Sequence, residues 1–166
     1  MTELTSIDSG QRVQVLLVCM GNICRSPTAH GVLRQLAEDM GMHEMLEVDS
    51  AGTHAYHVGE APDRRARETA ERRGIDLSDL RARRVTGVDF ERFDYVLAMD
   101  EDNLDILVEI CPPQHAHKVR LFMDFAPDWG VREVPDPYYG GPTGFEQVFD
   151  MVEAAAIGLL EEIRRR

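Results

Sequence analysis

The stretch VQVLLVCMGNICRSP, residues 13–27, decides how the rest of this sequence is interpreted. It opens on an apolar run of strand-forming residues, which predicts a buried β-strand. A short loop follows, and Pro27 suits the first turn of a helix. The loop also carries Cys19 and Cys24, whose spacing leaves three interpretations open: a redox pair, half a metal site, or a nucleophile with an unrelated neighbour.

The alternation of apolar runs and helical segments continues along the chain. Apolar runs at residues 13–18, 47–51, 94–99 and 119–122 predict strands, and helical spacing follows each of them, at residues 27–40, 62–73 and 100–110 and after residue 144. Strands that alternate with helices indicate a parallel sheet covered on both sides. We therefore predict a single α/β domain with a central four-stranded parallel sheet, preceded by a flexible tail at residues 1–12.

Composition narrows the class of protein. The 166 residues contain 43% hydrophobic residues and no apolar run approaching the roughly 20 residues of a membrane helix, which predicts a soluble protein with no membrane partner. A net charge of −12 disfavours nucleic acid, and eight arginines between residues 64 and 84 are read as a solvated face rather than an anion site. Three cysteines and no signal peptide favour the cytoplasm.

The loop at residues 19–25 has the features of an anion site. Because it leaves a strand and enters a helix, its backbone N–H groups can converge on one point, and the helix N-terminus adds partial positive charge. The guanidinium of Arg25 adds a bidentate fork. Gly21 and Asn22 are residue types that readily adopt the positive φ that such a ring of amides requires. The sequence therefore predicts an oxyanion cradle.

Cys19 begins this loop. A thiolate beside an arginine and a helix N-terminus is stabilised, so we expect Cys19 to be an anionic nucleophile, with Ser26 donating a hydrogen bond to it. A phosphoryl group fits the cradle, and in-line attack by sulfur would form a phosphocysteine. The leaving group then needs a proton from a carboxylic acid, for which the candidate is Asp136 in the irregular segment 133–144. This predicts a phosphate-binding loop after the first strand.

At these residues the chain resembles the low molecular weight protein tyrosine phosphatases. The resemblance covers nearly the whole chain after about residue 13, and its four signatures stand in the family's order: VCMGNICRSP (residues 18–27), DSAGT (49–53), MDEDNL (99–104) and DPYYGG (136–141). It implies a phosphatase domain at residues 13–166, a metal-independent hydrolase of phosphotyrosine without a cofactor.

The resemblance gives roles to matching residues. It implies that Cys19 is the nucleophile, Arg25 the phosphate clamp, Asp136 the general acid and base, and Ser26 a group that tunes the thiolate. The phosphate-binding loop would comprise Met20, Gly21, Asn22, Ile23 and Cys24. Hydrogen bonds that include Ser50 would let Asn22 hold the loop in shape.

The substrate pocket is implied by the same resemblance. Its walls would be Ile23, Tyr56, Tyr138 and Tyr139, large faces that can sandwich a phenyl ring. Relatives described as protein arginine phosphatases carry threonine at the position of Ile23, so the resemblance implies phosphotyrosine and not phosphoarginine as the substrate. The implied partners are phosphotyrosine proteins and a cognate tyrosine kinase, and the chain would be a monomer or a weak dimer.

Some alternatives stay open at this point. Cys24 is either a reversible disulfide partner that shields the nucleophile or a small buried residue. Tyr138 and Tyr139 either wall the pocket only or are themselves phosphorylated. The runner-up function is a thiol redox enzyme like arsenate reductase on the same scaffold, which would need a further cysteine pair where this chain offers only Cys111.

Two departures from the family pattern stand out. The family usually has glutamate where this chain has His30, and many members have histidine where it has Arg73. Both positions are expected to lie near the groups that support Asn22 and Asp49.

Overall fold

The chain was analysed as a computed structural model that describes residues 12–139 and 142–166, and for Tyr139, Pro142 and Thr143 the backbone alone. The tail expected at residues 1–12 thus lies outside the described residues except for Arg12. Four strands form one parallel sheet in the order β2-β1-β3-β4. Their bounds are Val13–Cys19 (β1), Leu46–Gly52 (β2), Tyr95–Ala98 (β3) and Val119–Leu121 (β4). The predicted α/β fold class with its parallel sheet is confirmed.

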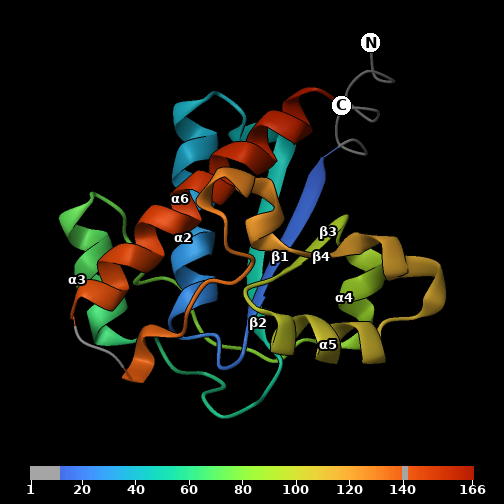
Figure 1. The fold of residues 1–166 in the computed structure, drawn as a ribbon, viewed down its shortest axis with the longest axis horizontal. Helices are drawn as coiled ribbons and strands as arrows, with labels where there is room; N and C mark the ends of the chain where they lie inside the picture. Colours follow the sequence, from blue (N-terminus) through green and yellow to red (C-terminus); the bar gives the residue numbers. More distant parts are fainter. Residues whose placement is uncertain (1–11, 140–141) are drawn as a thin grey trace.

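Helices cover both faces of this sheet (Figure 1). On one side lie α2 (Arg25–Asp39), α3 (Arg64–Arg72) and α6 (Pro142–Arg164), and on the other lie α4 (Gly87–Arg92) and α5 (Glu101–Ile110). Short 3-10 turns occupy Pro113–Lys118 (η2) and Phe122–Phe125 (η3), and η5 spans Pro137–Tyr139. The predicted layers are therefore present.

The central strand β1 divides the core in two. Val15 and Leu17 belong to the cluster under α2 and α6, whereas Leu16 and Val18 belong to the cluster under α4 and α5. All four side chains are fully buried, as expected when successive residues of a strand point to opposite faces and both faces are covered. Because β1 is buried on both faces, the loop at residues 19–25 that follows it is held at the middle of the sheet.

The helix α4 was not predicted from the sequence. It has only six residues, so hydrophobic periodicity gives little signal. Its N-terminus is set by a capping box, in which the Thr86 side chain accepts from the backbone of Asp89 and the Asp89 carboxylate accepts from the backbone of Thr86. By contrast, the helix predicted at residues 62–73 is present as α3, and the Asp63 carboxylate caps it by accepting from the backbone N–H of Arg65.

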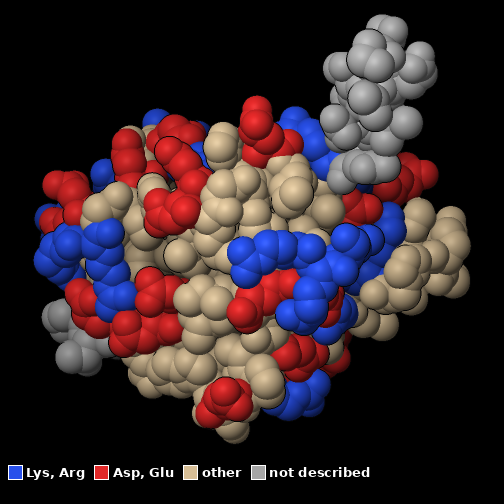
Figure 2. All heavy atoms as spheres, turned by 90° about the horizontal axis from the view of Figure 1, so that it is seen from above, with Lys and Arg blue, Asp and Glu red and all other residues tan. Residues whose placement is uncertain are grey.

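Charged side chains of opposite sign lie beside one another on the surface. On the face that Figure 2 shows, basic groups are flanked by acidic ones. Arg73 of α3, for example, pairs with Glu146 and Asp150 of α6 at 2.8 and 3.0 Å. Across the described part of the chain, no helix is long and apolar enough to cross a membrane.

Candidate active site

The loop at residues 19–25 lies at the carboxyl edge of the sheet, where β1 ends and α2 begins. Parallel strands place their carboxyl ends on the same edge, so segments after β2 and β3 meet there too. Asn22 has a left-handed backbone with φ of 58°, the one non-glycine residue with positive φ among the described residues. The predicted turn chemistry at Asn22 is thus present, and it lets the loop curl back over Cys19.

Two backbone donors and one hydroxyl surround the sulfur of Cys19. The backbone nitrogens of Asn22 and Ser26 lie 3.3 and 3.4 Å from Sγ, and the Ser26 hydroxyl lies 3.0 Å away. Cys19 is 2% exposed, so water contributes little to the solvation of its sulfur. Amide and hydroxyl donors that converge on one sulfur stabilise a negative charge there.

The side chain of Asn22 holds the loop at two ends. Its Nδ2 donates to Ser26 Oγ at 2.8 Å, and its Oδ1 accepts from the backbone N–H of Arg83 at 3.0 Å. Ser50, expected in this network, instead places its hydroxyl 3.0 Å from Nδ1 of His30. The link between Asn22 and Ser50 stays a prediction.

Arg25 points its guanidinium across the loop from the first turn of α2. Its Nη1 donates to Asp100 Oδ2 at 2.5 Å and to the carbonyl of Val134 at 3.1 Å, and its Nη2 lies 3.7 Å from Asp136 Oδ2. Burial alone would lower the pKa of Arg25, but the negative charges of Cys19, Asp100 and Asp136 outweigh burial and raise it. The Arg25 guanidinium is therefore a permanent cation held in a fixed orientation.

Asp100 is a site residue that the sequence reasoning missed. It caps α5 by accepting from the backbone of Asn103 at 2.7 Å with Oδ1, which leaves Oδ2 for Arg25. The signal that could have found it is its position, because a polar residue directly after a buried strand of a parallel sheet lies at the ligand-binding edge.

The segment with Asp136 closes over the loop from the far end of the sequence. The backbone N–H of Val134 bonds to the carbonyl of Met99 at 2.8 Å, which anchors the segment to the end of β3. Asp136 Oδ1 accepts from the backbone N–H of Tyr138 at 3.0 Å, so its second oxygen faces Arg25. A carboxyl predicted from sequence to meet Cys19 and Arg25 is thus brought to the same site.

A cavity of about 190 Å³ opens above the loop. It is lined by Cys19, Met20, Gly21, Ile23, Cys24, Arg25, Tyr56, His57, Asp136 and Tyr138. Tyr56, 67% exposed, stands at the rim and stacks on His54 with ring centroids 5.0 Å apart. His57 was missed, because nothing in its sequence context marks it. The side chain of Tyr139 lies outside the described residues.

Cys24 differs from Cys19 although only five residues separate them. Burial, and after it the nearby Asp63 carboxylate, raises the pKa of the Cys24 thiol strongly. The side chain is 5% exposed and clusters with Ala66, Ala82 and Phe145. All three cysteines are free thiols in the structure, and the described residues contain no cluster of three or more His, Cys, Asp or Glu side chains suited to a metal. The loop therefore places Cys19 among hydrogen-bonding groups and keeps Cys24 a neutral thiol.

The two departures from the family pattern have different surroundings. His30 is buried against Ser50, next to β2, in keeping with the expected support. Arg73 does not take part in that support, because its guanidinium pairs with Glu146 and Asp150 of α6 and lies over the ring of Phe149. Its role is to join two helices.

Comparisons with known proteins agree with this geometry. The family model for low molecular weight phosphotyrosine protein phosphatases matches residues 14–166. A low molecular weight protein-tyrosine-phosphatase of Streptomyces coelicolor is 44% identical, over 92% of this chain and 94% of its own. The human low molecular weight phosphotyrosine protein phosphatase is 40% identical, over 89% and 94%. A crystal structure of a protein tyrosine phosphatase from Entamoeba histolytica superposes with a TM-score of 0.89 at 40% identity, over 92% and 97%. The chain belongs to the low molecular weight phosphotyrosine protein phosphatase family.

Proposed function

We propose that this chain hydrolyses phosphotyrosine in proteins by transfer of the phosphoryl group to Cys19. The observation that carries the proposal is the convergence on Cys19 Sγ of two backbone N–H groups and the Ser26 hydroxyl, within a loop that Arg25 closes. A tetrahedral oxyanion group bound there would meet amide donors and a cation on one side and the sulfur at its centre.

In the first step the thiolate attacks phosphorus. An S–P bond forms, the P–O bond to the tyrosine breaks, and the electron pair stays on the phenolate oxygen. Asp136, whose carboxyl lies 3.7 Å from the Arg25 guanidinium, supplies the proton that this oxygen takes. Arg25 bonds two of the phosphoryl oxygens and neutralises their charge.

In the second step water replaces the tyrosine. Asp136, now a carboxylate, accepts a proton from water as its oxygen attacks phosphorus, and the S–P bond breaks to return the thiolate. Ser26 Oγ, 3.0 Å from Sγ, stabilises the sulfur as it leaves. Inorganic phosphate is released, and the two steps balance without a metal or cofactor.

The shape of the cavity supports selection of an aromatic substrate. The sulfur lies below a rim that includes Ile23, Tyr56 and Tyr138, so a phosphate group must be attached to a long side chain to reach it. A tyrosine spans that depth, and its ring meets apolar and aromatic faces on the way. Phosphoserine is too short to do the same.

The thiol redox alternative is not favoured. The relatives described above are tyrosine phosphatases, and Cys111 belongs to the separate core cluster under α4 and α5. Burial also raises the pKa of the Cys111 thiol. We further propose a cytoplasmic setting, a cognate tyrosine kinase and a monomer or weak dimer, on the grounds given by composition and family.

The test compares hydrolysis of phosphotyrosine, phosphoserine and phosphoarginine peptides with reduction of arsenate. We expect phosphotyrosine to be hydrolysed fastest and arsenate reduction to be absent. Cys19→Ser should abolish turnover of p-nitrophenyl phosphate while phosphate still protects the fold against heat. Turnover by Cys19→Ser at a tenth of the parent rate or more would refute the nucleophile assignment.

A further inference from the structure

Arg83 contributes to the loop although it lies outside the cavity lining. Its backbone N–H donates to Asn22 Oδ1 at 3.0 Å. Its carbonyl accepts from the backbone N–H of Gly52 at 2.8 Å, and a parallel bridge joins Gly52 to Arg84. The main chain at Arg83 thus connects the end of β2 with the phosphate-binding loop.

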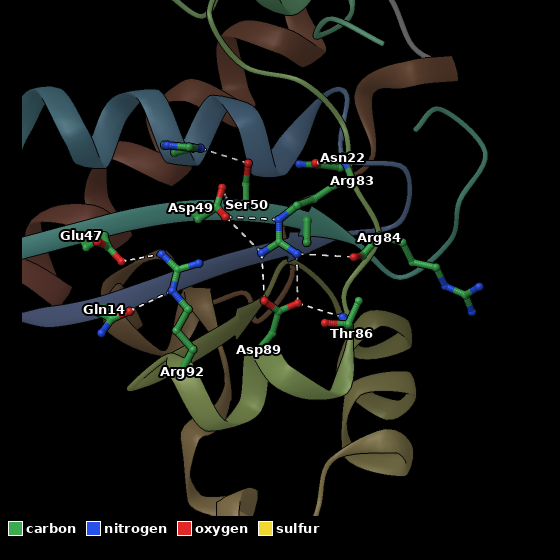
Figure 3. Close-up of polar contacts among 12 residues, drawn as sticks. Gln14, Asn22, Glu47, Asp49, Ser50, Arg83, Arg84, Thr86, Asp89 and Arg92 are labelled. Carbon is green, nitrogen blue, oxygen red and sulfur yellow. Dashed lines mark hydrogen bonds and ion pairs between the residues drawn. The ribbon is translucent and has the colours of Figure 1, made fainter. Parts of the chain in front are cut away.

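The side chain of Arg83 fixes that piece of main chain in place. Nη1 and Nη2 each bond one carboxylate oxygen of Asp89 at 3.0 Å, and Nε and Nη2 lie 3.2 and 3.1 Å from Asp49 Oδ2 (Figure 3). Asp89, whose side chain is 7% exposed, also caps α4. The guanidinium therefore bridges β2 and α4 in a bidentate geometry that leaves it little freedom.

This fixed point matters because the curled shape of the loop depends on the left-handed backbone of Asn22, whose φ is 58°. The bond from Arg83 is the one that orients the amide of Asn22, because the backbone N–H of Arg83 can only donate and so requires Oδ1, whereas the Ser26 hydroxyl can donate or accept. With Oδ1 turned to Arg83, Nδ2 must face Ser26 Oγ, and Ser26 Oγ lies 3.0 Å from the Cys19 sulfur.

We propose that Arg83 is a positioning residue for this site, which sets the orientation of Asn22 and through it the hydrogen-bond donors of Cys19. The proposal rests on the proposed function, because it concerns the same nucleophile. It extends that function to a residue whose side chain, within the described part of the chain, bonds only to groups outside the loop: Asp49, Asp89 and the carbonyl of Arg84.

The chain offers a matched control in Arg92. Its guanidinium also joins α4 to the sheet, with Nη2 2.7 Å from Glu47 Oε2 and Nε 3.2 Å from Gln14 Oε1 (Figure 3). These contacts lie farther along β2, toward its amino end, and none reaches the loop. Arg92→Met removes a comparable bridge without touching Asn22.

The first readout is alkylation of Cys19 by iodoacetate at neutral pH, followed by intact mass. Arg83→Met keeps the backbone N–H but releases it from its anchor. We expect alkylation to slow several-fold and kcat for p-nitrophenyl phosphate to fall roughly tenfold to a hundredfold, as for a small misplacement of reacting groups. Arg92→Met should leave both rates within about twofold of the parent. Equal losses in the two variants would overturn the proposal, because they would reflect only a weaker fold.

A double-mutant cycle tests whether Arg83 acts through Asn22. If it does, Asn22→Ala and the double variant Asn22→Ala, Arg83→Met have the same kcat, whereas independent effects would multiply and refute the proposal. Should Arg83→Met fail to fold, Arg83→Lys keeps one charge and loses the bidentate contact, and unchanged alkylation there would refute it equally. Alkylation needs no turnover, so it tests Arg83 even if no phosphatase activity is found.

Discussion

Replacing His30 with asparagine is expected to make the stability of the fold less sensitive to acid. His30 lies on α2 with a side chain that is 6% exposed, and its Nδ1 is 3.0 Å from the Ser50 hydroxyl. Burial, and after it the charge of Arg34, lowers the pKa of His30 from 6.5 to about 4, against the opposite pull of Asp49 and Asp79. The native imidazole is therefore neutral at every pH at which the enzyme would ordinarily be assayed.

The size of the effect follows from linkage. Above pH 6.5 the imidazole is neutral in both folded and unfolded chains, and its contribution is fully present. Below that value the unfolded chain binds a proton that the folded chain does not, so stability falls as pH drops until the folded group protonates near pH 4. The difference between the two pKa values corresponds to a loss of about 3 kcal/mol in the free energy of unfolding. About 2 kcal/mol of this has been lost when the pH reaches 5.

The assay is urea unfolding of parent and His30→Asn near pH 7.5 and near pH 5. Asparagine keeps a side chain that can bond Ser50, and carboxylates that titrate in both proteins cancel in the difference. Between pH 7.5 and pH 5 the free energy of unfolding of the parent should fall by about 2 kcal/mol more than that of the variant. This corresponds to a difference of roughly 4–8 °C in Tm for a domain of this size. His117→Asn, at an exposed histidine, is the control and should follow the parent. Equal acid sensitivity in parent and His30→Asn would refute the reasoning.

Three other outcomes follow from the geometry. Asp136→Asn should slow hydrolysis of phenyl phosphate, whose phenol has a pKa of about 10, far more than that of esters with acidic phenols; a uniform loss across a leaving-group series would contradict its acid role. Gly158→Ala would drive a Cβ into the carbonyl oxygen of Phe125 and should cost about 1–3 kcal/mol in urea unfolding. Gly87→Ala, where the Cβ meets nothing within 4 Å, is its control and should shift stability by less than about 0.5 kcal/mol. EDTA should leave the rate of p-nitrophenyl phosphate hydrolysis unchanged. A loss of activity in EDTA that added metal restores would contradict the metal-independent mechanism.

The sequence predicted those parts of the fold that depend on strong local patterns. Each predicted run became a strand within one residue of its expected ends, and the signal is clearest in β1, where residues 15–18 are apolar and fully buried. The loop after β1 was predictable because Cys19 and Arg25 sit at a fixed spacing between a strand and a helix. The helix α4 was not predicted because six residues are too few to show a helical hydrophobic period, although the capping pair Thr86 and Asp89 marks its start.

The residues that were missed are placed by tertiary contacts alone. Asp100 meets Arg25 across 75 positions of sequence, and Arg83 meets Asn22 across 61. The position of Asp100 after a buried strand marks it as a candidate, but no local rule pairs it with Arg25 or pairs Arg83 with Asn22. Arg73 shows the reverse error: its place where many family members have histidine suggested support for the loop, whereas its charge pairs with α6.

The net charge of −12 does not prevent binding of a dianionic phosphate at this site. Surface charges are screened over about 8 Å at physiological salt, and Figure 2 shows that acidic groups have basic neighbours. Arg25 is 3% exposed and the amides of the loop point at one atom, so their field acts at short range in a poorly screened pocket. The carboxylates near Arg25 fit the same arrangement, because Asp100 orients the guanidinium and Asp136 is the acid proposed to supply the proton. The proposed phosphate binding thus depends on the short-range field of Arg25 and of the backbone amides of Asn22 and Ser26, and not on the net charge of the whole chain.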